Sequence, residues 1–346
     1  MLLVDDSAVM RELLAHLLNA DPGIQVIGAA RNGEEAIEAV GRMRPDVITM
    51  DFHMPKMNGL DATRKIMETH PTPIVIVSGS SARNEVAAAF RVMEAGALAV
   101  AEKPAGPSHP GHEAAARELV QTVKLMSEVK VVRRWPRREV NAPAVPDRAI
   151  ELGPVNAEVK LVAIGASTGG PIVLKTVLSG LPKDFPVPIL IVQHIAPGFT
   201  QGFIEWLALA TGFAVLAATH GEPVLPGRAY VAPDGFHMRL GRDGRVVLTT
   251  DEPENGHRPS VSNLFRSVAE VMGQNATGVL LTGMGKDGAA ELKRLKDMGA
   301  VTIAQDQESS VVHGMPGEAI SLNAATCVLP AGKIADALKS LVNRDR

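Results

Sequence analysis

The stretch from Leu161 to Val173 reads Leu-Val-Ala-Ile-Gly-Ala-Ser-Thr-Gly-Gly-Pro-Ile-Val, and it decides the fold of the C-terminal part of the chain. Its apolar run is typical of a buried strand that stops at Gly165, and a helical pattern begins around Pro171. A strand that passes directly into a helix is the repeating unit of an α/β sheet, and such sheets place their chemistry at the turn between the two. We therefore expect Ser167 at the C-terminal edge of a parallel sheet.

The turn around Ser167 has two interpretations. Gly165, Ser167 and Gly169 match Gly-x-Ser-x-Gly, the sharp turn that exposes a nucleophilic serine. In the simpler interpretation, Ser167 or Thr168 caps the following helix and the glycines only form the turn. A phosphate-binding loop is disfavoured, because these glycines do not fit Gly-x-Gly-x-x-Gly. The choice between cap and nucleophile depends on the rest of the chain.

The composition is that of a globular protein with room for two domains. The chain has 346 residues, 46% of them hydrophobic, and a net charge of -3. The single cysteine, Cys327, excludes an intramolecular disulfide. There is no signal-peptide core, and no apolar run reaches the roughly 18 residues of a membrane span. We expect a cytoplasmic protein with no membrane insertion and no nucleic-acid partner.

The N-terminal third predicts a second parallel sheet. Apolar strand patterns at 2–4, 46–50, 73–77 and 97–101 alternate with helical patterns at 34–42, 60–70 and 84–95. Polar residues that follow these strands should meet at one sheet edge, and they are Asp5, Asp6, Asp51, Ser78 and Lys103. Converging carboxylates need a cation, and their hard oxygen ligands favour Mg2+ or Mn2+.

Three motifs in this third carry a family resemblance. They are Val-Asp-Asp-Ser-Ala-Val-Met-Arg at 4–11, Met-Asp-Phe-His-Met-Pro-Lys-Met-Asn-Gly-Leu at 50–60 and Glu-Lys-Pro at 102–104. They resemble the motifs of response-regulator receiver domains over residues 1–104. The resemblance implies a flavodoxin-like fold with a five-stranded parallel sheet.

The same resemblance implies roles for single residues. Asp51 would be phosphorylated by a histidine kinase, and Mg2+ would be bound by Asp5, Asp6, Asp51 and the backbone carbonyl of His53. Ser78 would be the switch hydroxyl, and Lys103 would contact the phosphate. Two features depart from the pattern: the chain begins inside the first strand, which looks clipped, and Val100 stands where receivers usually carry an aromatic residue.

Residues 105–158 read as a linker. Prolines cluster at both ends of a helical segment at 113–132, in which Leu119, Val123 and Met126 share one face. We expect that helix to extend the receiver to about residue 132. The basic run at 130–138, which includes Trp135, fits a solvated surface better than a site for an acidic partner. Residues 141–154 have the composition of an extended connector.

In the C-terminal domain, two further strands end in polar residues. The strand pattern at 188–192 runs into Gln193 and His194, and the one at 278–281 runs into a glycine-rich loop with Asp287. Helical patterns cover 199–209 and 261–272. Residues 215–248 look like hairpins beside the sheet, and a strand at 301–304 is expected to close it. We expect a doubly wound, mostly parallel sheet with a β-hairpin insertion.

Ser167, His194 and Asp287 thus stand at the C-terminal ends of three parallel strands. A nucleophilic triad requires this arrangement: the histidine takes the serine proton, and the aspartate orients the histidine. The chain order Ser, His, Asp differs from the Ser, Asp, His order of ordinary α/β hydrolases, but a triad is defined by geometry.

Several motifs in residues 159–346 carry a second resemblance. They are Gly-Ala-Ser-Thr-Gly-Gly at 165–170, Gln-His at 193–194, His-Arg-Pro-Ser-Val at 257–261, Leu-Thr-Gly-Met-Gly-Lys-Asp-Gly-Ala at 281–289 and Gly-Met-Pro at 314–316. They are similar to those of the chemotaxis protein-glutamate methylesterases. The family hydrolyses glutamyl methyl esters, and deamidates glutamines, on the cytoplasmic helices of chemoreceptors. Its receiver domain blocks the active site until it is phosphorylated.

By this resemblance Ser167 would be the nucleophile, His194 the base and Asp287 the residue that orients it. Amides near Thr168 and Met284 would bind the oxyanion, Thr168 would also bond to His194, and the esterase step would need no cofactor. Ser262 and Glu291 depart from the family pattern, since an acid is common at the first position and a glycine at the second.

Two other functions stay open beside the esterase. One is a non-catalytic adaptor that binds receptors or kinase through the same surface. The other is a DNA-binding output, which is disfavoured because 17 basic residues balance 17 acidic ones in residues 159–346 and no helix-turn-helix segment occurs there.

Overall fold

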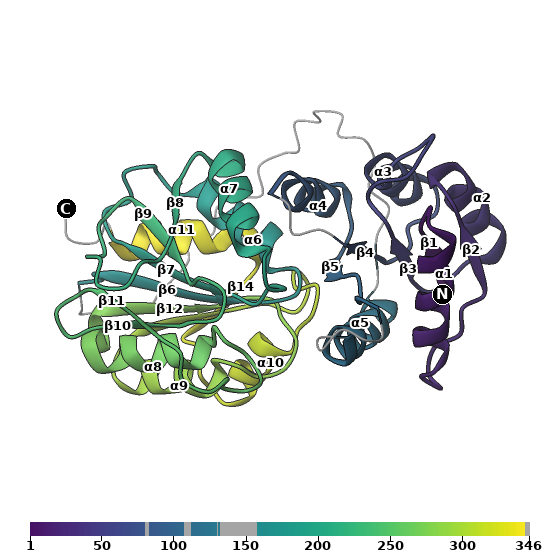
Figure 1. The fold of residues 1–346 in the computed structure, drawn as a ribbon. Helices are drawn as coiled ribbons and strands as arrows, with labels where there is room; N and C mark the ends of the chain where they lie inside the picture. The colour runs from purple at the N-terminus through teal and green to yellow at the C-terminus, as the bar shows by residue number, and fades with distance from the viewer. Residues whose placement is uncertain (80–82, 107–111, 130, 132–157, 343–346) are drawn as a thin grey trace, which may run out of the picture. The chain divides into compact units, whose positions relative to one another are not determined.

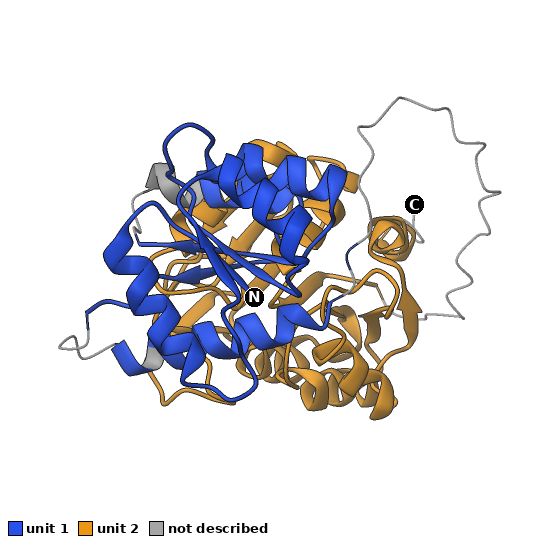
Figure 2. Ribbon diagram, turned by 90° about the vertical axis from the view of Figure 1, so that its right-hand side faces the viewer, with its two compact units in different colours: residues 1–146 blue, residues 147–346 orange. Residues whose placement is uncertain are grey.

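The computed structural model of this chain describes residues 1–79, 83–106, 112–129, 131 and 158–342. The chain divides into two compact units, residues 1–146 and 147–346, which Figure 2 colours separately. The predicted basic run and extended connector lie almost wholly outside the described residues. No helix in the described parts of the chain has the length and apolar character to cross a membrane.

The N-terminal unit is a five-stranded sheet covered on both faces (Figure 1). The strand order is β2-β1-β3-β4-β5, and every neighbouring pair is parallel. Helices α1 and α5 cover one face, and α2, α3 and α4 cover the other. The elements in chain order are β1 (Leu2–Val4), α1 (Ala8–Asn19), β2 (Gly28–Ala30), α2 (Gly33–Met43), β3 (Ile48–Met50), α3 (Gly59–Thr69), β4 (Ile74–Ser78), α4 (Arg83–Ala95), β5 (Ala99–Glu102) and α5 (His112–Ser127).

This unit confirms the predicted five-stranded parallel sheet and adds one strand to those read from the sequence. Strand β2 was missed because Gly-Ala-Ala has neither β-branched nor aromatic residues. The three-residue first strand pairs with both neighbours, and the amino group of Met1 donates to the Gln25 carbonyl at 2.7 Å. On α5, Leu119, Val123 and Met126 are buried, as their helical spacing predicted.

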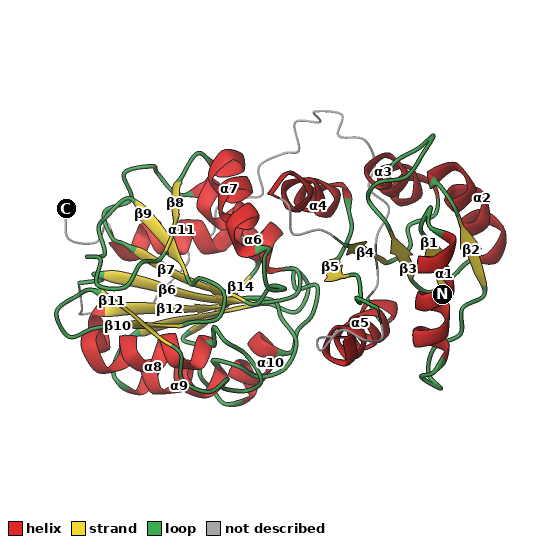
Figure 3. Ribbon diagram, in the orientation of Figure 1, coloured by secondary structure: helices red, strands yellow, loops and turns green. Residues whose placement is uncertain are grey.

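The C-terminal unit is a seven-stranded sheet in the order β14-β13-β12-β6-β7-β9-β8, with every neighbouring pair parallel. Figure 3 shows α6, α7 and α11 on one face and α8, α9 and α10 on the other, which confirms the doubly wound fold. The elements are β6 (Leu161–Ala166), α6 (Gly170–Gly180), β7 (Ile189–Gln193), α7 (Thr200–Thr211), β8 (Ala214–Ala217), β9 (Arg228–Val231), β10 (His237–Leu240), β11 (Val246–Thr249), α8 (Val261–Met272), β12 (Ala276–Leu280), α9 (Ala289–Asp297), β13 (Val301–Gln305), α10 (Met315–Ser321), β14 (Cys327–Leu329) and α11 (Ala331–Val342); a 3-10 turn spans Gly273–Asn275.

Two predictions about the edges of this sheet were wrong. Only β10 and β11 form a hairpin within 215–248, whereas β8 and β9 join the main sheet as parallel strands. Residues Ala229 to Val231 are buried, as a strand inside a parallel sheet must be. Strand β13 does not close the sheet, because β14 pairs beyond it. Strand β14 has three half-exposed or exposed residues and so leaves no apolar run to recognise.

The hairpin β10–β11 packs on α8 and extends the core on that side of the sheet. Met238, Leu240 and Val246 from the hairpin lie in one buried cluster with Leu264 and Phe265 of α8. At the centre of the sheet, β6 lies between β7 and β12. The strands after β6 in the chain are first added on the β7 side, and the order then reverses, so that β12, β13 and β14 are added on the other side. The crevice at such a reversal of strand order is where open α/β sheets bind their ligands.

Candidate active site

Ser167 lies in the turn between β6 and α6, and its side chain does not cap the helix. Helix α6 has Gly169 as its N-cap, at φ 79°, and no side chain bonds to the exposed amides of its first turn. The cap interpretation of Ser167 and Thr168 was therefore wrong. A left-handed residue is needed at Gly169 to turn the strand into the helix, which explains this glycine of the motif.

His194 occupies the equivalent position on the neighbouring strand. Ala166 and Gln193 are paired residues of β6 and β7, so Ser167 and His194 each follow directly after a paired residue. The His194 amide donates to the Ala166 carbonyl at 2.9 Å. The buried Gln193 side chain joins the two turns, since its Nε2 donates to the carbonyls of Ser167 at 2.9 Å and His194 at 2.8 Å.

Asp287 reaches the same edge from the loop between β12 and α9. Its Oδ2 lies 2.9 Å from Nε2 of His194, and both side chains are buried. The amide of Val261 donates to it at 2.7 Å and that of Ser262 at 3.1 Å, both from the first turn of α8. Ser260 adds its hydroxyl at 3.0 Å.

The surroundings of Asp287 favour its ionised form. Burial alone raises the pKa of a carboxyl group, but the bonds from His194, Ser262 and Val261 outweigh that effect and hold the pKa of Asp287 well below its usual range. The positive end of α8 acts in the same direction. Asp287 is therefore a charged acceptor that fixes one nitrogen of His194.

The second ring nitrogen of His194 is available for proton transfer. Its Nδ1 is buried and has no hydrogen-bond partner among the described residues. The predicted hydrogen bond between Thr168 and His194 does not form. With Nε2 held by Asp287, Nδ1 is the nitrogen that remains to take a proton.

Two backbone amides beside Ser167 could stabilise negative charge on a bound carbonyl oxygen. Within the described part of the chain, the amides of Thr168 and Met284 have no hydrogen-bond partner. The Thr282 hydroxyl donates to the Thr168 carbonyl at 2.9 Å and accepts from the Val312 amide at 3.0 Å, so the loops that carry these amides are tied together. A Cβ on Gly283 would lie 2.6 Å from that of Ser167, so only glycine allows this approach.

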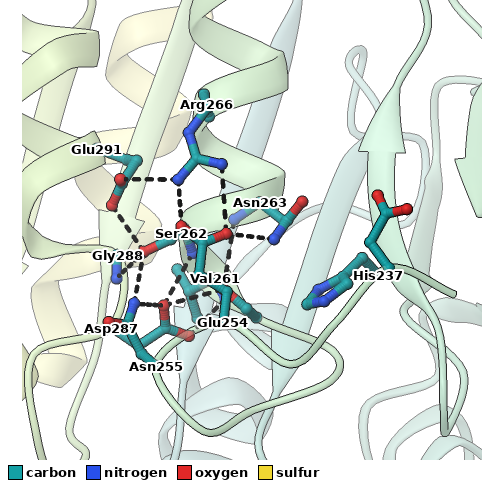
Figure 4. Close-up of polar contacts among 12 residues, drawn as sticks. His237, Glu254, Asn255, Val261, Ser262, Asn263, Arg266, Asp287, Gly288 and Glu291 are labelled. Atoms are coloured by element: carbon teal, nitrogen blue, oxygen red, sulfur yellow. Dashed lines mark hydrogen bonds and ion pairs between the residues drawn. The ribbon is translucent and has the colours of Figure 1, made fainter. Parts of the chain in front are cut away.

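Ser262 and Glu291, the two departures from the family pattern, contact one another (Figure 4). The Ser262 hydroxyl donates to Oε2 of Glu291 at 2.7 Å, and Oε1 of Glu291 accepts from Arg266 at 3.2 Å. The Ser262 hydroxyl also accepts from the Gly288 amide at 3.0 Å, next to Asp287. Ser262 and Glu291 together support the loop that carries Asp287. The sequence alone does not indicate this contact.

Other contacts to the site were not predicted. Asn255 donates to Oδ1 of Asp287 at 3.0 Å, and the ring of His257 is stacked on that of His194. In the sequence, His257 stands out only as the first residue of the His-Arg-Pro-Ser-Val motif. The Asn255-Gly256 pair is a turn signal in the sequence, but it does not indicate what the turn contacts.

The acidic residues of the N-terminal unit also converge. Asp5, Asp6 and Asp51 each offer a carboxylate oxygen within 4.8 Å of the others. Lys103 forms ion pairs with Asp5 at 2.8 Å and with Asp51 at 3.0 Å, and its amide donates to the carbonyl of Ser78 at 2.8 Å. Three carboxylates at one point suit a hard divalent cation, so the residues present fit Mg2+.

The charges of this cluster interact strongly. Burial raises the pKa of Asp51, and Asp5 adds to this, while Lys103 opposes it. Burial lowers the pKa of the Lys103 ammonium, but the contacts with Asp5 and Asp51 outweigh it and raise the pKa overall. A cation placed among the carboxylates would relieve the repulsion between Asp5 and Asp51.

Comparison with known proteins agrees with both halves of the chain. Residues 162–338 match the family model of the CheB methylesterase, and residues 1–110 match that of the response regulator receiver domain. A protein-glutamate methylesterase/protein-glutamine glutaminase of Geobacter metallireducens is 59% identical, and the match covers 98% of each chain. One of Nitrosospira multiformis is 58% identical, over 99% of this chain and 96% of its own.

Among solved structures, the CheB methylesterase catalytic domain of Thermotoga maritima is 41% identical with a TM-score of 0.52, and the match covers 54% of this chain and all of that one. The family models and the full-length relatives show that the chain belongs to the CheB methylesterase family and carries a response regulator receiver domain ahead of the catalytic domain.

Proposed function

We propose that the chain is a protein-glutamate methylesterase and protein-glutamine glutaminase whose catalytic triad is Ser167, His194 and Asp287. The observation that carries the proposal is the placement of His194. Its Nε2 contacts the ionised carboxylate of Asp287, and its buried Nδ1 has no hydrogen-bond partner in the described part of the chain. His194 directly follows Gln193, which pairs with Ala166, the residue before Ser167. We take residues 159–346 as the catalytic domain, 105–158 as the linker and 1–104 as the receiver, extended by a helix.

The reaction follows from this geometry. The Ser167 hydroxyl attacks the side-chain carbonyl of the substrate while its proton passes to Nδ1 of His194. The carbonyl oxygen becomes negative and is bound by the amides of Thr168 and Met284; one such donor contributes about 3 kcal/mol where it has been measured. The proton then passes to the leaving group, which departs as methanol or ammonia. Water releases the glutamate by the same steps in reverse order.

A measurement of methanol release from membranes with methylated chemoreceptors tests the triad. Wild type should release methanol, and Ser167→Ala should lower the rate by at least about 10³-fold, since the nucleophile is lost. Equal rates for the two proteins would contradict the proposal. A wild type that binds the receptors but releases no methanol would instead support a non-catalytic adaptor.

We further propose that the receiver controls the hydrolase. Asp51 would accept a phosphoryl group from the histidine kinase of the chemotaxis system. Mg2+ would be held by Asp5, Asp6 and Asp51 with the backbone carbonyl of His53, and it would neutralise the added negative charge. Lys103 would contact the phosphoryl group and Ser78 would serve as the switch hydroxyl. The proposed substrates are the cytoplasmic helices of chemoreceptors, so the protein would act in the cytoplasm.

A further inference from the structure

A tight turn next to the catalytic residues carries His257. Glu254 and His257 exchange backbone hydrogen bonds of 3.1 and 3.0 Å, and the two residues between them, Asn255 and Gly256, have φ of 54° and 80°. An Asn-Gly pair in left-handed conformation is the usual two-residue hairpin turn. The turn therefore fixes the backbone of His257 and the direction of its Cα–Cβ bond.

Glu254 and Asn255, the first two residues of this turn, both contact residues that surround Asp287 (Figure 4). The Glu254 carboxylate forms an ion pair with Arg266, which also contacts Glu291 at 3.2 Å. The Asn255 side chain donates to Asp287 at 3.0 Å and to the Ser262 hydroxyl at 3.3 Å. The turn is thus fixed to the residues that hold Asp287 and, through Asn255, to Asp287 itself, which lies 32 residues further along the chain.

At the end of the turn, the imidazole of His257 lies flat against that of His194. The ring centroids are 3.8 Å apart, and the planes differ by 10°. Two imidazoles at this distance cannot both carry a charge without strong repulsion. Burial and then the proximity of His194 lower the pKa of His257 to about 4, so this ring is neutral near pH 7.

We propose that His257 is a positioning residue for His194, a role that rests on the triad proposed above. Contact with one face of the His194 ring limits its rotation, so Nε2 stays on Asp287 and Nδ1 stays available to Ser167. When His194 takes the serine proton, the neutral π face of His257 also lies against the new positive charge. A cation against an aromatic face is favourable, and more so where water is excluded.

Two variants separate the ring contact from other effects. His257→Ala removes the ring, whereas His257→Phe keeps a flat aromatic face without any titratable group. For the full-length protein we expect His257→Ala to lower kcat for methanol release by roughly 3- to 30-fold with KM unchanged, the range expected for loss of one such contact. His257→Phe should stay within about 3-fold of wild type.

A second readout separates activation of the serine from binding of the receptor. Phenylmethanesulfonyl fluoride sulfonylates an activated serine, with loss of fluoride, and needs no protein substrate, so His257→Ala should slow this inactivation by about the same factor as kcat. The matched control is His220→Ala: His220 is exposed on another loop and accepts a hydrogen bond from the Leu248 amide. It should leave both rates unchanged.

The outcomes are distinguishable. A His257→Ala protein whose kcat falls by roughly 3- to 30-fold while its thermal unfolding matches wild type, together with a His257→Phe protein within about 3-fold of wild type, supports the inference. A His257→Ala with wild-type rates, or a His257→Phe as slow as His257→Ala, overturns it while the triad stands. If His257→Ala fails to fold, the kcat of His257→Phe and its rate of sulfonylation decide. Loss of the difference between wild type and Ser167→Ala would overturn the triad itself.

Discussion

A carboxylate that accepts hydrogen bonds on every side has little freedom to rotate, and Asp287 is in this position. Its donors are the side chains of His194, Asn255 and Ser260 and two backbone amides. A flexible aspartate would let the His194 ring turn and exchange its two nitrogens. The fixed carboxylate removes that possibility before substrate binds, which is the preorganisation that lowers a barrier.

The Ser262–Glu291 contact predicts a compensating pair of substitutions. Ser262→Asp alone should destabilise the fold by about 1–3 kcal/mol, because it sets a second carboxylate against the half-buried carboxylate of Glu291. Adding Glu291→Gly should restore most of that loss, since Arg266 again faces Glu254 and one further carboxylate. Urea unfolding of wild type, both single variants and the double variant measures the coupling.

Additive losses in that cycle would show that the two residues act independently. Glu270→Gly is the control, because Glu270 forms an exposed ion pair with Arg294. It should change the free energy of unfolding by no more than about 1 kcal/mol and show no coupling to Ser262→Asp.

The lowered pKa of His257 predicts a specific sensitivity to acid. The unfolded chain binds this proton near pH 6.5 and the folded chain only near pH 4, so between these values the unfolded state holds more protons. Stability therefore falls as the pH falls through this window, by about 2 kcal/mol at pH 5 from this residue. His257→Phe lacks the effect, so its melting temperature relative to wild type should rise from pH 7 to pH 5. A difference independent of pH would contradict the assignment.

At the scale of elements, the approach of α8 to β6 sets the position of Asp287. The Val261 side chain at the start of α8 fills the space left by two glycines: a Cβ on Gly165 would lie 2.3 Å from it, and one on Gly288 would lie 2.4 Å away. Gly165 is thus required for close packing, while Gly169 forms the turn. Gly165, the first glycine of the Gly-x-Ser-x-Gly motif, therefore allows the N-terminal amides of α8 to reach Asp287.

This packing predicts the effect of one added methyl group. Gly165→Ala should destabilise the fold by about 1–3 kcal/mol and lower kcat, because Val261 and the amide that binds Asp287 must move. Combining it with Val261→Ala should recover part of both losses. Thermal unfolding and methanol release measure the two effects.

Gly332→Ala is the matched control for that substitution. A Cβ there would meet nothing within 4 Å, and Gly332 lies in α11, where alanine is the better helix former. We expect it to raise the melting temperature and leave kcat unchanged. A Gly165→Ala protein that behaves like this control would contradict the packing argument.

At the scale of the whole molecule, the chain joins a response regulator receiver domain to a methylesterase domain. The acidic cluster with Lys103 lies in the N-terminal unit, and the proposed triad lies in the C-terminal unit. All residues of each set lie at one edge of the sheet of that unit. No residue of the cluster belongs to the triad, so the proposed phosphorylation changes no catalytic residue directly.

This division predicts that control can be removed without loss of catalysis. Asp51→Asn should keep the basal rate of methanol release and lose all stimulation by a small phosphodonor such as acetyl phosphate, because the amide cannot be phosphorylated. Asp21→Asn, at a carboxylate that pairs with Lys124 away from the cluster, should remain stimulated. Stimulation of Asp51→Asn equal to wild type would place the switch elsewhere.

The sequence by itself determined which residues could meet. Buried parallel strands are apolar runs that end in polar residues, and strand ends of a parallel sheet share an edge. For this reason Ser167, His194 and Asp287, and likewise Asp5, Asp51 and Lys103, could be named before any coordinates. Strands β2 and β14 could not be predicted in this way. Each has only three residues, which are small in β2 and half-exposed or exposed in β14, so neither strand forms an apolar run.

Only the tertiary structure decided how those side chains are held. Which nitrogen of His194 binds Asp287, the contact of Ser262 with Glu291 and the stacking of His257 on His194 all join loops that are distant in sequence. Such contacts depend on how α8 and its preceding turn pack against the sheet edge. Local sequence sets the conformation of a turn, but long-range packing sets what the turn touches.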